Sequence, residues 1–158
     1  MRQNEVGILL VEDNPADVEL TLHALRRSKL ANRIDVVRDG EEALDFLFCR
    51  GAHSRRTLSD QPRLILLDLK LPKVDGLQVL QQIKSDPRTR AIPVVILTAS
   101  TETQDLLAGY QSGVNSYLQK PVDFDAFQKM IVQVGMYWLV VNQPPPPITN
   151  GGIPEKIA

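Results

Sequence analysis

The chain has 158 residues, of which 43% are hydrophobic, and a formal net charge of −1 at pH 7. This length predicts one domain with an ordinary hydrophobic core. The near-neutral charge gives no reason to expect direct binding to nucleic acid or to anionic lipid. The single cysteine, Cys49, excludes an internal disulfide.

The first residues, 1–5, lack the character of a signal peptide, which favours a cytoplasmic location. No charged residue occurs between Met130 and Pro154, but the apolar part of this stretch ends at Val141, and four prolines follow shortly after. That part is about a dozen residues long, whereas a membrane-spanning helix needs ~20. We therefore expect no membrane association and interpret the stretch as the end of an amphipathic helix.

Five short apolar runs predict buried strands at 6–11, 34–37, 64–67, 94–97 and 116–118. The first, third and fourth runs are continuous rather than alternating in polarity. Such runs are typical of strands in a parallel sheet that is covered on both faces.

Helical patterns fill the intervals between these runs. The first helix is predicted to begin after the N-cap candidate Asn14, with Pro15 at its first position. The second and third are predicted to follow Asp39-Gly40 and Asp75-Gly76, and the third stops near Asp86. The fourth ends near residue 113, and the fifth runs from about 123 to 141.

Five alternations of strand and helix favour an open, doubly wound parallel sheet. We expect an α/β, flavodoxin-like (βα)5 fold, whose strand order 2-1-3-4-5 is that of known folds of this class. This domain would span residues 1–141. Residues 142–158 are rich in proline and glycine and would form a flexible tail without an effector domain, and 50–62 would form a long surface loop.

Chemically active residues follow four of the strands: Glu12 and Asp13, then Asp68, Thr98 and Lys120. The carboxyl ends of parallel strands meet at one edge, so these groups would share one crevice. Carboxylates a few Å apart repel each other, and Mg²⁺ relieves that repulsion with oxygen ligands. One carboxylate oxygen could then accept a phosphoryl group, because catalysis of that transfer is mostly positioning and charge neutralisation.

The other groups would support this chemistry. The Thr98 hydroxyl and the backbone N–H of Ala99 can donate to phosphoryl oxygens, and the Lys120 ammonium can neutralise their charge. Each residue also has an ordinary structural interpretation. An acidic pair often begins a helix, Asp68 or Thr98 could cap a turn, and Lys120 could be a solvated lysine. The combination at four successive strand ends is more specific than any single residue.

The chain resembles the receiver domain of two-component response regulators over about residues 6–141. The resemblance is carried by four pieces: Leu9-Leu10-Val11-Glu12-Asp13, Asp68-Leu69-Lys70-Leu71-Pro72-Lys73-Val74-Asp75-Gly76, Thr98-Ala99 and Lys120-Pro121. It implies that Asp68 is the phosphoacceptor and receives its phosphoryl group from a histidine kinase or a phosphotransfer protein.

The resemblance also implies a ligand set for Mg²⁺. Asp13 and Asp68 would bind the ion directly, Glu12 would act mainly through water, and the backbone carbonyl of Lys70 would complete the set. The long loop at 50–61 departs from minimal receivers. Lys70 and Ser100 stand where the family tunes hydrolysis, which leaves the phosphoryl lifetime open.

Further implied roles concern the phosphoryl group and the switch. Thr98 and Lys120 would contact the phosphoryl oxygens, and the Lys120-Pro121 bond would be cis, a state that only an X-Pro bond reaches cheaply. Tyr117 stands where the family places its switch aromatic. The alternative for Tyr117 is a half-buried strand tyrosine.

These features predict a single-domain response regulator that is not an enzyme beyond its own phosphorylation and dephosphorylation. Output would occur through protein contacts of the fourth helix, fifth strand and fifth helix. The alternatives are a receiver-fold adaptor that works without phosphate and a phosphate sink in a phosphorelay. A dehalogenase-type phosphatase is disfavoured because it needs a second acid where Lys70 stands.

Apolar residues on two sides of the fifth helix suggest an interface. Phe127, Ile131, Val134 and Trp138 form a stripe that would face the sheet. A homodimer is expected through the remaining apolar surface, with the candidates Phe124, Met130, Tyr137 and Val141. Alternatively, the proline-rich tail would cover this surface.

The residues at 11–17, the Leu71-Pro72 variant, the long loop and Tyr137-Trp138 also resemble the small regulators of bacterial and cyanobacterial phytochromes. That resemblance implies a red-light-sensing histidine kinase as the partner.

Overall fold

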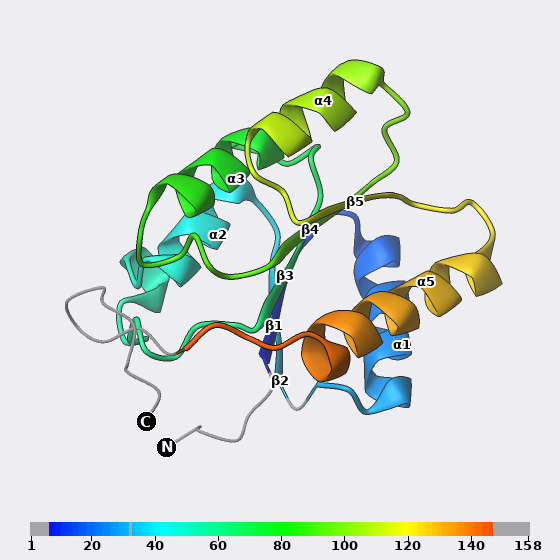
Figure 1. Ribbon diagram of the computed structural model, residues 1–158, viewed down its shortest axis with the longest axis horizontal. Coiled ribbons are helices and arrows are strands. Elements are labelled where there is room, and N and C mark those ends of the chain that lie inside the picture. The colour runs from blue at the N-terminus through cyan, green and yellow to red at the C-terminus, as the bar shows by residue number, and fades with distance from the viewer. Residues whose placement is uncertain (1–6, 32, 147–158) are drawn as a thin grey trace.

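The computed structural model describes residues 7–31 and 33–146, so the predictions for Val6 and for 147–158 lie outside the described residues (Figure 1). Five parallel strands form one sheet in the order β2-β1-β3-β4-β5, which confirms the predicted fold. The strands are β1 (Gly7–Val11), β2 (Arg33–Val37), β3 (Leu64–Leu67), β4 (Val94–Thr98) and β5 (Ser116–Gln119).

Helices α1 and α5 cover one face of the sheet, and α2, α3 and α4 cover the other (Figure 1). Because both faces are covered, β1, β3 and β4 are buried almost along their whole length. The helices are α1 (Pro15–Ser28), α2 (Gly40–Leu47), α3 (Gly76–Ser85), α4 (Thr103–Gln111) and α5 (Phe124–Met136), with a 3₁₀ turn η1 (Gly51–His53) and a π-helical turn η2 (Tyr137–Val141).

The helix starts follow the sequence signals closely. Asn14 Oδ1 accepts hydrogen bonds from the backbone N–H groups of Ala16 and Asp17 at 2.9 and 3.2 Å. Asp39 caps α2, and Asp75 caps α3 within a capping box that includes Gln78. These caps satisfy backbone donors that would otherwise lack partners, and each contributes about 1 kcal/mol.

Hydrogen bonds between strands continue past the strand ends and fix the register there. The backbone N–H of Glu12 donates to Val37 O, and that of Asp68 donates to Val11 O at 3.1 Å. The backbone N–H of Lys120 donates to Thr98 O at 2.7 Å. The residues that follow these strands are therefore held side by side at one edge of the sheet.

The fifth helix differs from its prediction at its end. It is α-helical only to Met136 and then continues as η2. The predicted inward stripe is confirmed, since Phe127 and Ile131 are buried and Val134 and Trp138 pack against the same core. Within the described residues, no helix is both long and apolar enough to cross a membrane.

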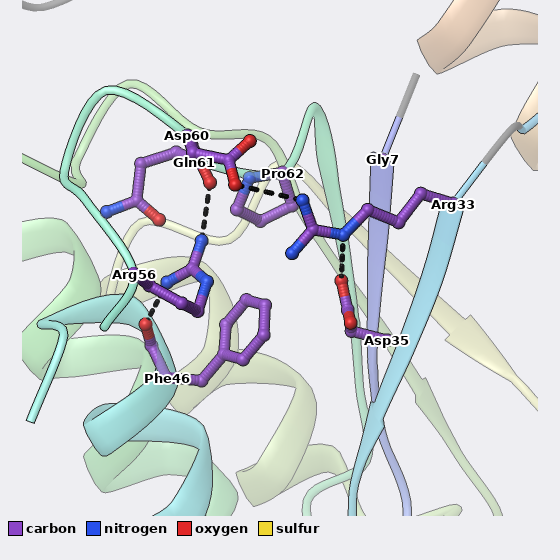
Figure 2. Close-up of a pocket in the computed structure, with 8 residues that line it drawn as sticks. All are labelled: Gly7, Arg33, Asp35, Phe46, Arg56, Asp60, Gln61 and Pro62. Atoms are coloured by element: carbon purple, nitrogen blue, oxygen red, sulfur yellow. Dashed lines mark hydrogen bonds and ion pairs between the residues drawn. The ribbon is translucent and has the colours of Figure 1, made fainter. Parts of the chain in front are cut away.

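The predicted surface loop at 50–62 is anchored at its middle. The Arg56 guanidinium lies 3.6 Å from the centre of the Phe46 ring and donates to the carbonyl oxygens of Phe46 and Asp60. Arg33 connects Asp35 and Asp60 at 2.9 Å each beside a small cavity (Figure 2). This cavity lies at the amino ends of the strands, opposite the edge where the acidic residues lie.

Candidate functional site

Three carboxylates meet at the carboxyl edge of the sheet. Glu12, Asp13 and Asp68 each offer an oxygen, and these oxygens lie within 4.8 Å of one another. Glu12 and Asp68 are buried, with 3% and 8% of their surface exposed, while Asp13 is open to solvent. The strands thus bring the predicted acids together, with one of them at the mouth of the crevice.

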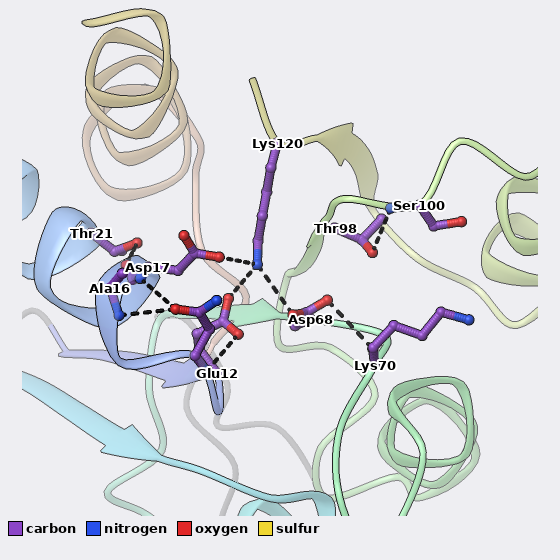
Figure 3. Close-up of polar contacts among 10 residues, drawn as sticks. Glu12, Ala16, Asp17, Thr21, Asp68, Lys70, Thr98, Ser100 and Lys120 are labelled. Atoms are coloured by element: carbon purple, nitrogen blue, oxygen red, sulfur yellow. Dashed lines mark hydrogen bonds and ion pairs between the residues drawn. The ribbon is translucent and has the colours of Figure 1, made fainter. Parts of the chain in front are cut away.

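Lys120 reaches into this cluster from the end of β5 (Figure 3). Its Nζ lies 2.5 Å from Glu12 Oε1, 2.8 Å from Asp17 Oδ2 and 3.1 Å from Asp68 Oδ2. Asp17, in the first turn of α1, was missed from the sequence. Its position one turn after Glu12-Asp13 was the available signal, since the start of a helix that follows β1 must lie close to the carboxyl edge.

The protonation of the cluster is set by burial and by neighbouring charge. Burial, and to a smaller extent the charge of Asp68, raises the pKa of Glu12 to about 7 against the opposing effect of Lys120. Burial alone would lower the pKa of Lys120, but hydrogen bonds to Asp17 and Glu12 outweigh it and raise that pKa above its usual value. Lys120 is therefore held as a cation among acids.

The donor set fits Mg²⁺. Three carboxyl groups (Glu12, Asp17 and Asp68) contact one ammonium and Asp13 lies beside two of them, so the site keeps an excess of negative charge. The open position of Asp13 leaves room for the waters that Mg²⁺ retains. Glu12, Asp13 and Asp68 are the residues that would hold the ion.

Thr98 and Lys70 lie on the other side of Asp68 (Figure 3). Thr98 is fully buried, and its Oγ1 accepts a hydrogen bond from Ser100 N–H at 3.2 Å. The backbone N–H of Lys70 donates to Asp68 Oδ1 at 3.4 Å, while its side chain extends away from Asp68. Ala99, which directly follows β4, is exposed.

The predicted cis bond between Lys120 and Pro121 is wrong, because the described residues contain no cis peptide. The trans form is favoured by about 0.5–1 kcal/mol for an X-Pro bond. Here the trans bond already allows the Lys120 backbone to pair with Thr98 and its Nζ to reach three carboxylates.

Tyr117 is half-buried in β5 and packs against the core on the α2–α3–α4 face. Its hydroxyl oxygen is buried and makes no hydrogen bond of regular geometry within the described part of the chain, although it lies close enough to Ser100 for a weak one. Burial raises the pKa of Tyr117, and the charge of Asp105 adds to this, while the weak bond to Ser100 lowers that pKa. A buried hydroxyl that is only weakly paired is unfavourable, so this position suits a side chain that can move.

The residues expected at a dimer interface divide into two groups. Phe124, Tyr137 and Val141 expose 52%, 51% and 60% of their surface. Met130 is half-buried and packs against the core between α1, α5 and the sheet, so much of its surface is already used within the fold.

The family of the chain follows from comparison with known proteins. The family model of the response regulator receiver domain matches residues 8–132. The chain belongs to the response regulator receiver family. Its site residues Glu12, Asp13, Asp68, Thr98 and Lys120 all lie within the matched range.

Named relatives agree with this assignment. The probable methanogenesis regulatory protein FilR2 of Methanothrix harundinacea is 47% identical over 140 residues, covering 89% of this chain and 88% of FilR2. Response regulator Rcp1 of Synechocystis is 42% identical over 132 residues, covering 84% of this chain and 88% of Rcp1. A structure of Rcp1 in its Mn²⁺-bound form superposes with a TM-score of 0.83 at 39% identity, covering 89% of this chain and 99% of that one.

A solved structure of the phosphorylated cyanobacterial phytochrome response regulator RcpA superposes with a TM-score of 0.84 at 38% identity. It covers 89% of this chain and 99% of RcpA. The receiver chain described here is therefore related to phytochrome response regulators in both sequence and fold.

Proposed function

We propose that Asp68 accepts a phosphoryl group from a phosphohistidine of a histidine kinase, with Mg²⁺ as the cofactor. The observation that carries the proposal is the convergence of Glu12, Asp13 and Asp68 within 4.8 Å beside the Lys120 ammonium. Transfer breaks the N–P bond of the phosphohistidine and forms an O–P bond on Asp68, and the proton balance is completed on the released imidazole.

The protein's own groups prepare Asp68 for this reaction. Lys120 neutralises charge on the side of Asp68 Oδ2, and the backbone N–H of Lys70 lies near Oδ1. Thr98 is proposed to turn its hydroxyl toward the phosphoryl oxygens. The backbone N–H of Ala99 is proposed to donate a hydrogen bond to them as well. Mg²⁺, when bound, would neutralise developing charge on the phosphoryl group.

We propose a phytochrome-type histidine kinase as the partner and the cytoplasm as the location. Relationship to RcpA and Rcp1 supports the partner. Val122 and Phe124, two and four residues after Lys120, expose 105% and 52% of their surface, and we propose them as apolar docking contacts. A second candidate is a kinase of a metabolic regulatory system, which the similarity to FilR2 favours.

Output is proposed to occur through the surface formed by α4, β5 and α5, with Tyr117 as the switch and a homodimer as one form. Leu106, Leu107 and Tyr110 on α4 expose 41%, 56% and 55% of their surface, which is unusual for a solvated helix and supports a protein contact. A phosphate sink or a phosphate-independent adaptor would not need this surface to respond to phosphorylation. Light scattering after gel filtration, with and without phosphate, tests the dimer.

Phosphotransfer from a purified kinase tests the proposed partner. A phytochrome-type histidine kinase is first loaded with radiolabelled phosphate from ATP, separated from ATP and mixed with this chain and Mg²⁺. We expect rapid transfer of label to the wild type, none to Asp68→Asn, and slower transfer from an unrelated kinase. Equal rates from both kinases would contradict the partner, and label on Asp68→Asn would contradict the acceptor.

A further inference from the structure

We propose that Asp105 is a positioning residue that ties the first turn of α4 to Thr98 through Ser100, and that this tie holds the unphosphorylated form. This inference rests on the proposed function, because the tie can affect switching only if Asp68 accepts a phosphoryl group. We call the chain of hydrogen bonds from Thr98 through Ser100 to Asp105 the α4 latch.

The α4 latch consists of three hydrogen bonds. Ser100 Oγ donates to Asp105 Oδ2 at 2.6 Å and accepts from Glu102 N–H at 3.2 Å. Ser100 N–H donates to Thr98 Oγ1 at 3.2 Å. Ser100 therefore joins the residue at the end of β4 to two residues at the start of α4.

The N-terminus of α4 depends on the α4 latch because α4, unlike the other described α-helices, has no side-chain cap at its N-cap residue. Helices α1, α2, α3 and α5 begin with Asn or Asp side chains that accept backbone hydrogen bonds, but the N-cap of α4 is Glu102, whose side chain makes no such bond in the described structure. Ser100 takes over part of the cap. The Asp105 side chain, only 16% exposed, adds negative charge at the positive end of the helix dipole.

Helix α4 also packs against Tyr117, the proposed switch residue. Gly109 of α4 lies so close to the sheet that an added Cβ would be 3.1 Å from Tyr117 Cδ2 and 3.3 Å from Ile96 Cδ1. The backbone of α4 thus rests directly on the Tyr117 ring. A shift of α4 must change the space available to that ring, whose buried hydroxyl makes at most a weak hydrogen bond to Ser100.

A phosphoryl group on Asp68 would draw the Thr98 side chain away from Ser100, because Thr98 must rotate before its hydroxyl can donate to a phosphoryl oxygen. When Thr98 turns toward the phosphoryl oxygens, Ser100 N–H loses its acceptor, and the Ser100–Asp105 pair loses its fixed position. The latch thus favours the unphosphorylated form, and opening it is part of the cost of switching. By linkage, breaking the latch beforehand should make a phosphoryl group easier to bind.

Binding of beryllofluoride, a non-covalent phosphoryl mimic, tests the α4 latch in the presence of Mg²⁺. The variants are Asp105→Ala and Ser100→Ala, which remove opposite ends of the same hydrogen bond. We expect each to bind beryllofluoride on the order of fivefold more tightly than the wild type, the factor set by one net hydrogen bond. Amide exchange in residues 103–111 should rise in both variants without the mimic.

Two further variants distinguish the hydrogen bond between Ser100 and Asp105 from a general effect of negative charge at the N-terminus of α4. Asp105→Asn keeps an oxygen that can accept from Ser100, so it should restore most of the wild-type affinity. Glu102→Gln removes a negative charge from the same helix end without touching the Ser100–Asp105 bond, and should bind like the wild type. The double variant of Ser100→Ala and Asp105→Ala should bind no more tightly than Asp105→Ala alone, because Asp105→Ala already lacks both the Ser100–Asp105 bond and the Lys70–Asp105 ion pair at 3.8 Å.

The outcomes distinguish this inference from the proposed function. If the wild type binds beryllofluoride but Asp105→Ala and Ser100→Ala bind with unchanged affinity, the α4 latch is refuted while the acceptor role of Asp68 stands. Additive effects in the double variant, or equal effects of Glu102→Gln and Asp105→Ala, would also refute it. If the wild type neither binds the mimic nor accepts a phosphoryl group, the proposed function fails, and the latch fails with it.

Discussion

Lys120 Nζ lies 3.1 Å from Asp68 Oδ2 and still closer to Glu12 and Asp17, so one ammonium serves three carboxylates from three separate elements. The Lys120 side chain is 9% exposed. Charges this well shielded from water interact strongly, and removing one partner leaves the others without compensation. The relationship makes Lys120 a structural as well as a chemical component of the site.

Lys120→Met should lower the free energy of unfolding by about 3 kcal/mol in metal-free solution, because the buried Glu12 and Asp68 lose their cation. Mg²⁺ should reduce this loss by supplying positive charge to the same acids. Urea denaturation with EDTA and with Mg²⁺ measures both effects. Lys129→Met, which removes an exposed lysine of α5, is the control, and a loss no larger than in this control would contradict the account.

Mg²⁺ should raise the thermal midpoint of the wild type, since a ligand that binds only the native state stabilises it. Asp13→Asn should abolish this rise and should itself raise the metal-free stability, because it relieves the repulsion of Asp13 by Glu12 and Asp68. Scanning calorimetry across a Mg²⁺ titration provides the measurement. Asp125→Asn, at another exposed aspartate, should respond to Mg²⁺ like the wild type; an equal response in Asp13→Asn would argue against the metal site.

Gly76→Ala should distort the segment that carries Asp68. A Cβ at Gly76 would lie 2.3 Å from Asp68 O and 2.6 Å from Leu69 Cα, so backbone must move to admit it. We expect a loss of about 2 kcal/mol or more in stability and slower phosphorylation. Gly7→Ala is a matched control, because its Cβ would meet only Pro62 Cα at 3.9 Å. If Gly76→Ala is as stable as the control, the close approach of Gly76 to Asp68 and Leu69 does not constrain the backbone there.

Lys84 gives a pH-dependent prediction away from the site. Its ammonium donates to Arg90 O, Ile92 O and Asn115 Oδ1 at 3.0, 2.8 and 2.9 Å, and burial lowers its pKa to about 8 from 10.5. Between these two values the unfolded chain holds more protons than the native one, so raising the pH favours the native state.

The stability of the wild type relative to Lys84→Met should therefore increase as the pH rises from 8 to 10.5. Urea titrations of both proteins at several pH values in this window give the difference directly. A difference that stays flat would mean that the three acceptors offset the effect of burial on the pKa of Lys84.

The fold was predictable because its signals are local and redundant. Continuous apolar runs marked β1, β3 and β4, and Asn14, Asp39 and Asp75 marked helix starts whose caps the structure contains. The strand order came from known folds, since pairing of distant strands leaves no local trace in one sequence. The change from α-helix to η2 at Tyr137 was missed because an apolar pattern alone does not distinguish i→i+4 from i→i+5 hydrogen bonding.

The site was predictable in its members but not in its connections. A parallel sheet brings together whatever follows its strands, which placed Glu12, Asp68 and Lys120. The contact of Asp17 with Lys120 depends on how α1 leaves the sheet, and the Ser100–Asp105 bond depends on a loop conformation. The cis bond at Pro121 was inferred from family resemblance alone, and no local pattern in this chain requires it.

Intact mass spectrometry after incubation with acetyl phosphate and Mg²⁺ tests the central claim most directly. The wild type should gain the mass of one phosphoryl group, the gain should vanish with EDTA and in Asp68→Asn, and Asp125→Asn should behave like the wild type. A wild type that gains no mass, or an Asp68→Asn variant that gains the same mass as the wild type, would contradict the account.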